Sequence, residues 1–559
     1  MTEYLSLKKS NCKNCYKCIR HCPVKSIRFT DDRAYIVEDE CILCGECYVV
    51  CPQDAKEIRN DLPSAKRLVA ENSFVAASIA PSFVANYGIS VEALADALKK
   101  LGFALTEETA LGATQVKRRY EEMTREEGRK IIISSCCHSV NLLIRKYYPE
   151  AISCLADVTS PMLAHAKDIK SRNPGAKVIF IGPCISKKSE ADEYQGIVDC
   201  ALTFEELSAW LDEAGIELKH DEKIAADAKT KARLFPTSGG ILRTMDCDTP
   251  GWSYLTIDGT ENCREALDDI VAGKLDKCFI EMSACRGSCV NGPIMEKKRH
   301  TPVSGTVAVY NYAGREDFDV NQPSAADMKK AHTRYEIRRN YPGEAKIREI
   351  LQQMGKTSPA DELNCGTCGY PTCRDKAIAV YQGKANISMC LPFLKEKAES
   401  FSDTIINNTP NGIIVLNESL EVEQVNRAAL ELLKIRAAAD VLGEPVVRIL
   451  DPKIFLDVLT TGKPVRGERT FLAEYNKYVE QTITYDKSYQ VIICILRDVT
   501  AEEDERLKKE ELSRHTVEIT DKVIEKQMRV VQEIASLLGE TTAETKIALT
   551  RLKESLNDE

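Results

Sequence analysis

The chain has 559 residues, of which 23 are cysteine, and a formal net charge of −9 at pH 7. A chain of this length holds about three to five domains. It is too long for a small secreted module held by disulfides, so many of its cysteines are expected to bind metal or stay reduced. Lys and Arg are spread without a basic stripe, which argues against nucleic acid as a partner. No signal-peptide core and no apolar run of membrane-spanning length is visible, so we expect a cytoplasmic protein without a membrane span.

Residues 1–60 contain two cysteine runs of the same spacing, each ending in Cys-Pro. This is the spacing of bacterial two-cluster ferredoxins, in which the fourth cysteine of each run binds the other cluster. One 4Fe-4S cluster is therefore expected on Cys12, Cys15, Cys18 and Cys51, and a second on Cys41, Cys44, Cys47 and Cys22. A pair of structural zinc sites is the alternative, although zinc spacing does not call for the Cys-Pro endings.

Residues 65–335 alternate short apolar segments with amphipathic ones, which predicts an α/β domain. Buried strands are expected at 75–80, 130–133 and 177–182, and helices at 90–101 and 204–214. Two loops that contain cysteine, after Ile133 and after Ile181, follow strands directly. Ligand sites of open α/β sheets gather at such strand ends.

Four cysteines in three loops of this domain are predicted to share one metal site. Cys285 and Cys289 lie four apart around Gly287, which lets the backbone fold closely around a bound group. Two thiolates cannot complete a tetrahedral site, and Cys137 and Cys184 supply the other two. The alternative is that Cys285 and Cys289 are small core residues. Glycine and polar residues interrupt that stretch, which argues against a continuous core strand.

The ferredoxin pair is followed in order by Ser-Cys-Cys, Pro-Cys-x-x-Lys-x-x-Glu and Glu-x-x-x-Cys-x-x-x-Cys. This order resembles the iron-only, or FeFe, hydrogenases over residues 1 to about 320. The resemblance implies an H-cluster, in which a 4Fe-4S cube shares one cysteine with a diiron unit that carries CO, cyanide and a bridging azadithiolate. The implied cube ligands are Cys137, Cys184, Cys285 and Cys289, with Cys289 bridging to the diiron unit.

The implied reaction interconverts H2 with two protons and two electrons. Its implied partners are a ferredoxin-like electron carrier and the hydrogenase maturation machinery. Lys187 would hydrogen-bond a cyanide, because a fixed ammonium suits a buried anion. Cys136 would relay protons to the azadithiolate amine, and the alternative is a second small buried thiol. Glu108, with Glu107 as the register alternative, and Ser160 fit parts of the family's proton path.

The chain departs from the family pattern beside the ligands. His138 stands where the family has proline, Gly182 and Ser283 stand where it has methionine, and the third loop ends early at Asn291-Gly-Pro. Leu111 replaces the second acid of the proton path. Such neighbours tune a metal site without supplying ligands. We therefore expect an altered active site with slow turnover.

Residues 341–397 carry four further cysteines, Cys365, Cys368, Cys373 and Cys390. Their spacing resembles the small 4Fe-4S domain of electron-transport and corrinoid proteins, which implies one further 4Fe-4S cluster. Zinc is the alternative for four clustered thiolates. Six cysteines remain and are predicted to be core residues: Cys154, Cys200, Cys247, Cys263, Cys278 and Cys494.

Residues 400–500 resemble a PAS domain, with two strands, a helix around Asn426, and late strands that end in Arg-Asp-x-Thr. No haem or flavin signature is visible in this segment. Residues 501–559 form a charged coiled-coil signalling helix in this interpretation. Its apolar seam repeats every seven residues and favours a parallel homodimer, with Val517, Ile524, Val531 and Leu538 along it.

The whole sequence thus predicts a multidomain α/β protein: ferredoxin-like domain, H-cluster domain, small 4Fe-4S domain, PAS domain and C-terminal helix. A purely metabolic hydrogenase would need neither the PAS domain nor the C-terminal helix. Their presence favours a sensory hydrogenase that acts on a kinase or serine phosphatase. The first alternative is a catalytic, ferredoxin-linked hydrogenase. The second is a non-enzymatic iron-sulfur redox sensor without the diiron unit, which the presence of Cys136, Lys187 and Cys289 argues against.

Overall fold

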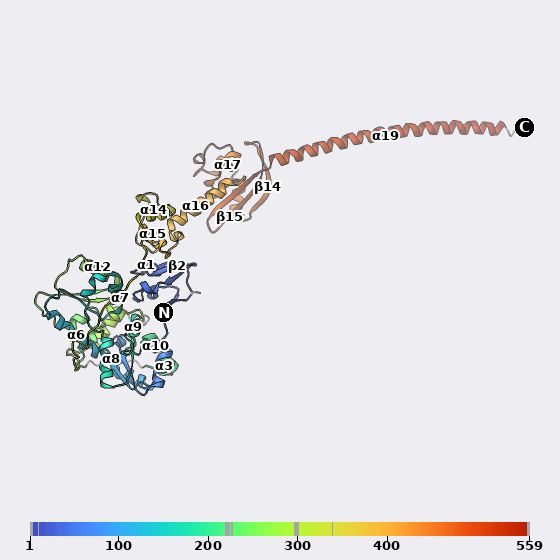
Figure 1. Cartoon of the computed structure of the whole chain (residues 1–559). Helices are drawn as coiled ribbons and strands as arrows, with labels where there is room; N and C mark the ends of the chain where they lie inside the picture. Colours follow the sequence, from blue (N-terminus) through green and yellow to red (C-terminus); the bar gives the residue numbers. More distant parts are fainter. Residues whose placement is uncertain are drawn as a thin grey trace. The chain divides into compact units, whose positions relative to one another are not determined.

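The computed structural model describes residues 4–8, 11–218, 224, 227–295, 301–337 and 339–555. The chain divides into two compact units, Met1–Leu394 and Lys395–Glu559, whose elements are labelled in Figure 1. None of the helices in these described ranges combines the length and the apolar character needed to cross a bilayer.

The ferredoxin-like region is built from two small antiparallel sheets. β1 (Leu5–Leu7) pairs with β4 (Lys56–Ile58), and β2 (Ile27–Thr30) pairs with β3 (Arg33–Ile36). Its short helices are α1 (Lys17–His21), η1 (Glu38–Glu40) and α2 (Glu46–Val49). The helices carry or adjoin cysteines of both runs, and Cys18, Cys22, Cys41 and Cys47 are buried.

Two separate parallel sheets form the centre of the next region. The first has the order β6-β5-β8-β9, with β5 (Val75–Ile79), β6 (Leu105–Glu108), β8 (Lys177–Gly182) and β9 (Cys200–Thr203). The second has the order β10-β11-β7, with β7 (Ile131–Ile133), β10 (Ser253–Asp258) and β11 (Cys278–Ser283). Every residue of β5 is buried, as expected for a parallel strand covered on both faces.

Helices and 3-10 turns connect and surround these strands. They are α3 (Leu62–Glu71), α4 (Phe83–Tyr87), α5 (Val91–Lys100), α6 (Ala110–Arg125), α7 (His138–Tyr147), η2 (Pro149–Cys154), α8 (Pro161–Arg172), α9 (Ser186–Glu193), α10 (Phe204–Glu213), η3 (Lys231–Leu234), α11 (Gly240–Thr244), α12 (Thr260–Val271), η4 (Ser288–Asn291) and α13 (Pro302–Tyr312). α10 begins with a capping box, in which the Thr203 hydroxyl and the Glu206 carboxylate satisfy two backbone amides.

The three expected strands and two expected helices are confirmed within one residue at each end. β11 was not expected as a strand, because Glu281 and Ser283 interrupt its apolar run. Both belong to the strand nevertheless, and Glu281 is buried. The expectation for Cys247 was wrong: this residue is exposed, because it lies in the polar loop that follows α11.

The small cysteine domain also belongs to the first unit. It contains α14 (Glu344–Gln353), η5 (Pro359–Asp361), α15 (Cys373–Tyr381) and η6 (Ile387–Met389). It contacts the ferredoxin-like region directly, since the Phe29 amide donates to the Lys384 carbonyl at 2.8 Å. Cys368 and Tyr370 share a hydrophobic core with Cys18 and Cys22.

α16 (Leu391–Asn408) leads along the sequence into a five-stranded antiparallel sheet of order β13-β12-β16-β15-β14. Its elements are β12 (Gly412–Asn417), β13 (Val422–Val425), α17 (Arg427–Leu432), η7 (Ala438–Asp440), η8 (Val446–Arg448), α18 (Lys453–Thr461), β14 (Val465–Leu472), β15 (Lys477–Asp486) and β16 (Val491–Asp498). Asn426 caps α17, where its side-chain oxygen accepts from the Ala429 amide. α19 (Thr500–Ser555) then runs as one helix.

Gly112 marks the closest approach of α6 to α8. A Cβ at this position would lie 2.4 Å from the Pro161 carbonyl oxygen and 2.7 Å from the His165 amide nitrogen. Both atoms belong to the backbone and cannot rotate away. Gly112→Ala is therefore expected to destabilise the first unit by about 2–3 kcal/mol through overpacking. The anaerobic thermal midpoint measures this loss.

Gly343→Ala is the control, because nothing lies within 4 Å of its Cβ position. Equal thermal midpoints for Gly112→Ala and Gly343→Ala would contradict the close packing of α6 against α8.

Candidate metal centre

Three loops meet at the carboxyl ends of β7, β8 and β11 and enclose a cavity of about 120 Å³. Cys137, Cys184 and Cys289 line this cavity. Burial, and then the neighbouring Cys184 and Cys137 thiols, raise the pKa of both Cys285 and Cys289. The structure therefore brings together the four cysteines that the sequence assigned to one site.

The third loop owes its shape to a left-handed turn. Gly287 has φ 77°, a conformation that glycine adopts without strain. Its amide donates to an Asp258 carboxylate oxygen at 3.1 Å, and the Ser238 hydroxyl donates to the same oxygen at 2.7 Å. These contacts fix the turn that separates Cys285 from Cys289.

α9 places Lys187 beside the cavity and holds it there through a buried carboxylate. The Lys187 ammonium donates to Glu190 at 2.5 Å and to the Cys136 carbonyl oxygen at 3.1 Å. Lys330 donates to the other Glu190 oxygen at 2.6 Å. Burial alone would raise the pKa of Glu190, but the two ammonium groups hold it well below its usual range. Lys187 therefore remains charged at the cavity wall.

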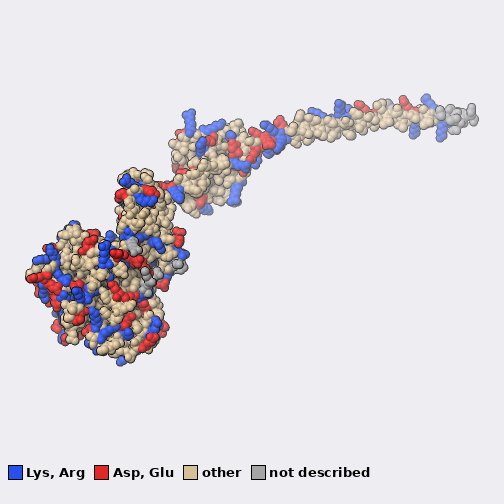
Figure 2. All heavy atoms as spheres, viewed as in Figure 1, with Lys and Arg blue, Asp and Glu red and all other residues tan. Residues whose placement is uncertain are grey.

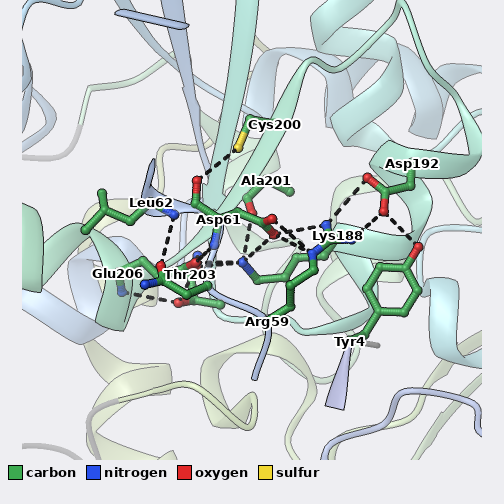
Figure 3. A network of polar contacts seen from close by, with 11 residues as sticks. Tyr4, Arg59, Asp61, Leu62, Lys188, Asp192, Cys200, Ala201, Thr203 and Glu206 are labelled. Carbon is green, nitrogen blue, oxygen red and sulfur yellow. Dashed lines mark hydrogen bonds and ion pairs between the residues drawn. The ribbon is translucent and has the colours of Figure 1, made fainter. Parts of the chain in front are cut away.

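The opposite side of α9 binds the ferredoxin-like region (Figure 3). Lys188 is buried and donates to Asp61 at 2.8 Å and to Glu206 at 2.7 Å. Arg59 pairs with Asp192 at 2.6 Å, at the end of the same helix. α9 thus lies between the cavity and a network of charges, centred on the buried Lys188, that joins two regions of the first unit.

Cys136 lies in the cavity wall with its thiol 3.2 Å from the Tyr120 hydroxyl. Burial raises the pKa of Cys136 to about 12, so the thiol keeps its proton at neutral pH. Glu281 also lines the cavity, and burial raises its pKa to about 7. His138 is a further wall residue, and burial lowers its pKa to about 3, which leaves the ring neutral.

Glu108, the glutamate predicted for the proton path, and its register alternative Glu107 are both engaged in ion pairs. Glu108 is buried, receives a 2.5 Å contact from Arg233, and accepts from the Tyr312 hydroxyl at 3.0 Å. Burial raises the pKa of Glu108 in spite of Arg233. Burial would raise the pKa of Glu107 too, but the ring of His165 and the guanidinium of Arg172 hold it at about 2.

Ser160 is buried and caps α8, where its hydroxyl accepts from the Leu163 amide at 3.5 Å. Within the described residues, the cavity wall contains Thr109 and Pro161 rather than their neighbours Glu108 and Ser160. Relay roles for Glu108 and Ser160 therefore stay predictions. Sequence reasoning gave no role to Tyr120, Glu281 or His138, although the replacement of a family proline by His138 was a visible signal.

The ferredoxin cysteines gather across the two runs. Burial raises the pKa of Cys18, and the thiols next to it are Cys12, Cys15 and Cys51. Burial likewise raises the pKa of Cys47, whose thiol neighbours are Cys41, Cys44 and Cys22. The Cys44 thiol also contributes to the raised pKa of Cys285, so the second group lies near the cavity cysteines.

The small domain brings its cysteines together less tightly. Burial lowers the pKa of Lys376 to about 8, and Cys368 and Cys390 are the thiols that oppose this shift. Burial raises the pKa of Cys373, and the nearby Cys390 thiol adds to this rise. Cys365 is exposed, and its thiol lies 3.2 Å from the Thr367 hydroxyl.

Family comparisons cover most regions of the chain. Residues 73–293 match the iron only hydrogenase large subunit, C-terminal domain. Residues 4–52 match a 4Fe-4S dicluster domain, 361–392 an Fe-S cluster family and 400–499 the PAS fold.

Individual relatives are distant or cover little of the chain. Iron hydrogenase 1 of Clostridium pasteurianum is 24% identical over 351 residues, which are 52% of this chain and 61% of the relative. A ferredoxin of Saccharopolyspora erythraea is 44% identical over 46 residues, which are 8% of this chain and 43% of the relative. The chain thus spans less than two thirds of the length of these relatives.

Among solved structures, a variant of the FeFe-hydrogenase HydA1 from Chlamydomonas reinhardtii matches with a TM-score of 0.39 and 16% identity, over 50% of this chain and 99% of that one. The PAS domain of an HTR-like protein from Haloarcula marismortui matches with a TM-score of 0.15 and 21% identity, over 18% and 98%. The matched families define a modular chain in which iron-sulfur regions flank a hydrogenase-type domain. Residues 73–293 belong to the iron-only, or FeFe, hydrogenase family, and residues 400–499 form a PAS domain.

The network around Lys188 predicts a large cost when its central charge is removed. Lys188→Met leaves the partly buried Asp61 and Glu206 with less compensation, and loss of one partner from a buried ion pair costs up to about 3–5 kcal/mol. The thermal midpoint at equal iron content measures the effect. Lys66→Met is the matched control, because its pair with Glu213 is much more exposed and contributes about 1 kcal/mol or less. Similar losses in the two variants would contradict a buried network that holds α9.

Proposed function

We propose that this chain binds an H-cluster, reacts with H2, and uses the resulting redox change as a signal. The observation that carries the proposal is the cavity itself. Cys137, Cys184 and Cys289 line it, and Cys285 lies next to these three thiols. A charged Lys187 and a protonated Cys136 belong to the same wall. This donor set suits a thiolate-bound iron cluster with an anionic ligand nearby.

When bound, the H-cluster supplies the metal at which H2 is split or formed. The residues of this chain would prepare the surroundings. Lys187 would donate to a cyanide, because Glu190 and the Cys136 carbonyl already fix its ammonium. The Cys136 thiol would hold and release a proton at its sulfur, next to the Tyr120 hydroxyl. Met162 and Phe180 in the cavity wall would exclude water.

The ferredoxin-like cysteines would hold two 4Fe-4S clusters, and those of the small domain one more. Cys44 would help to hold the cluster nearest to Cys285, since its thiol contributes to the raised pKa of Cys285. That cluster would supply electron transfer, with a ferredoxin-like carrier as partner. Cys390, the last ligand of the small domain, is followed at once by α16. α16 would therefore transmit a redox-dependent change from the small domain to the PAS segment that follows it in the sequence.

The output would be a homodimer formed through α19 and a kinase or serine phosphatase partner. The predicted seam residues Val517, Ile524, Val531 and Leu538 are all exposed on this helix. A row of exposed apolar side chains on a long helix is the typical surface of a coiled coil. Two states of such a helix would be populated differently when the redox state changes.

Sensing is tested by hydrogen exchange of the matured full chain under H2 and under argon. The proposal expects amide exchange in α16 and residues 400–499 to differ by about tenfold or more between the gases, because one state of the output region is favoured. Unchanged exchange together with rapid turnover of reduced ferredoxin would identify a metabolic hydrogenase instead. A response in protein that lacks the diiron unit would identify a redox sensor without hydrogenase chemistry.

The proton role of Cys136 is tested by Cys136→Ala. We expect H2 turnover to fall by about 10²-fold or more, because a positioned acid-base group contributes about 10²–10⁴-fold. Iron content should stay unchanged, since Cys136 is not a proposed ligand. Cys154→Ala, at a cysteine outside the cavity wall, is the control. Turnover in Cys136→Ala equal to that of the control would remove the relay assignment.

A further inference from the structure

His138 is a buried imidazole with two unpaired nitrogens. The residue is 1% exposed, and neither Nδ1 nor Nε2 has a hydrogen-bond partner. A buried polar group left unpaired costs about 1–3 kcal/mol, so native proteins rarely keep one without a reason. A neutral imidazole needs one acceptor and one donor, and the described protein atoms supply neither.

The charged groups nearest to His138 are already paired with one another. Nε2 lies 3.9 Å from a Glu193 oxygen, which is too far for a hydrogen bond. That carboxylate takes its contact at 2.8 Å from Arg145. Glu190 in turn lies between Lys187 and Lys330. The ring is therefore not required to neutralise either carboxylate.

His138 lies at the wall of the cavity. It follows Cys137 directly, begins α7, and is one of the residues that line the cavity wall. The acceptor that the ring lacks within the protein can thus be supplied by a group held on the four cysteines. Such a group offers two kinds of acceptor, the sulfur atoms of a cube and the cyanide of a diiron unit.

We propose that His138 donates a ring N–H hydrogen bond to the H-cluster, as a positioning and tuning residue rather than a ligand. The inference rests on the proposed function, because it requires the cluster to be bound. Hydrogen bonds to cluster sulfur or to a cyanide stabilise the more negative, reduced state. This chain would thereby hold its cluster at a higher reduction potential than a chain without the donor.

The test replaces His138 in the full chain with phenylalanine or glutamine. His138→Phe keeps a planar apolar ring and removes the donor, while His138→Gln restores an N–H donor. In His138→Phe we expect a lower reduction potential of the cube or shifted CO and cyanide infrared bands, at unchanged iron content. His138→Gln should return these signals toward those of the unchanged chain.

His332→Phe is the matched control. The His332 ring already donates from Nε2 to the Ala156 carbonyl oxygen at 3.0 Å, and the residue is not part of the cavity wall. This variant should leave both the potential and the bands unchanged. Thermal midpoints measured alongside show which variants remain folded.

Two preparations distinguish the acceptors. A shift already present in protein that carries the cube without the diiron unit assigns the bond to sulfur, and a shift confined to the complete cluster assigns it to cyanide. Potentials and bands that are the same in His138→Phe and the unchanged chain would overturn the inference. If the unchanged chain shows no CO or cyanide bands after maturation, the proposed function fails, while the cube potential still tests His138 separately.

Discussion

The candidate site depends on a carboxylate buried between two ammonium groups. Glu190 is inaccessible to solvent, and without Lys187 and Lys330 its charge would be prohibitively costly. Glu190 pairs with Lys187 on one side and with Lys330 on the other. These pairs fix the first turn of α9 and hold the Lys187 ammonium at the cavity. Lys188, one residue further on, faces the opposite way into its own pairs with Asp61 and Glu206. A short helix is thus held by charge on two sides.

This arrangement joins the ferredoxin-like region to the site in space as well as in sequence. Lys188 reaches Asp61, which follows the last ferredoxin strand, and the Cys44 thiol contributes to the raised pKa of Cys285. The cluster region and the cavity therefore share both a polar network and a cysteine neighbourhood. The surface in Figure 2 carries acidic and basic residues interspersed, without a continuous basic stripe on the face shown. Any carrier that exchanges electrons with this region would be recognised by local contacts more than by a large field of one sign.

Cysteine spacing predicted the ferredoxin-like region, since residues 4–52 match a 4Fe-4S dicluster domain. The multidomain α/β fold with its PAS domain was also predicted correctly, from periodicity together with family resemblance. Spacing could not predict that the three cavity loops come from two separate sheets. It also missed β11, because Glu281 and Ser283 resemble loop residues until the backbone shows that they belong to a strand.

Long-range partners were beyond sequence reasoning. The pairing of Glu108 with Arg233 joins residues 125 positions apart, and nothing local to Glu108 signals it. The unpaired ring of His138 is likewise a property of the packed cavity. Cys247 was placed in the core by residue type alone, and its polar neighbours Asp246 and Asp248 were the signal for an exposed loop.

The central claim is that Cys137, Cys184, Cys285 and Cys289 hold a complete H-cluster. Infrared spectroscopy of the full chain after anaerobic maturation tests this most directly, because CO and cyanide bound to iron absorb where protein does not. The account predicts CO and cyanide bands in the unchanged chain and their loss in Cys289→Ser, with the ferredoxin clusters intact in both. Absence of these bands from the matured, unchanged chain with its other iron-sulfur clusters in place would contradict it.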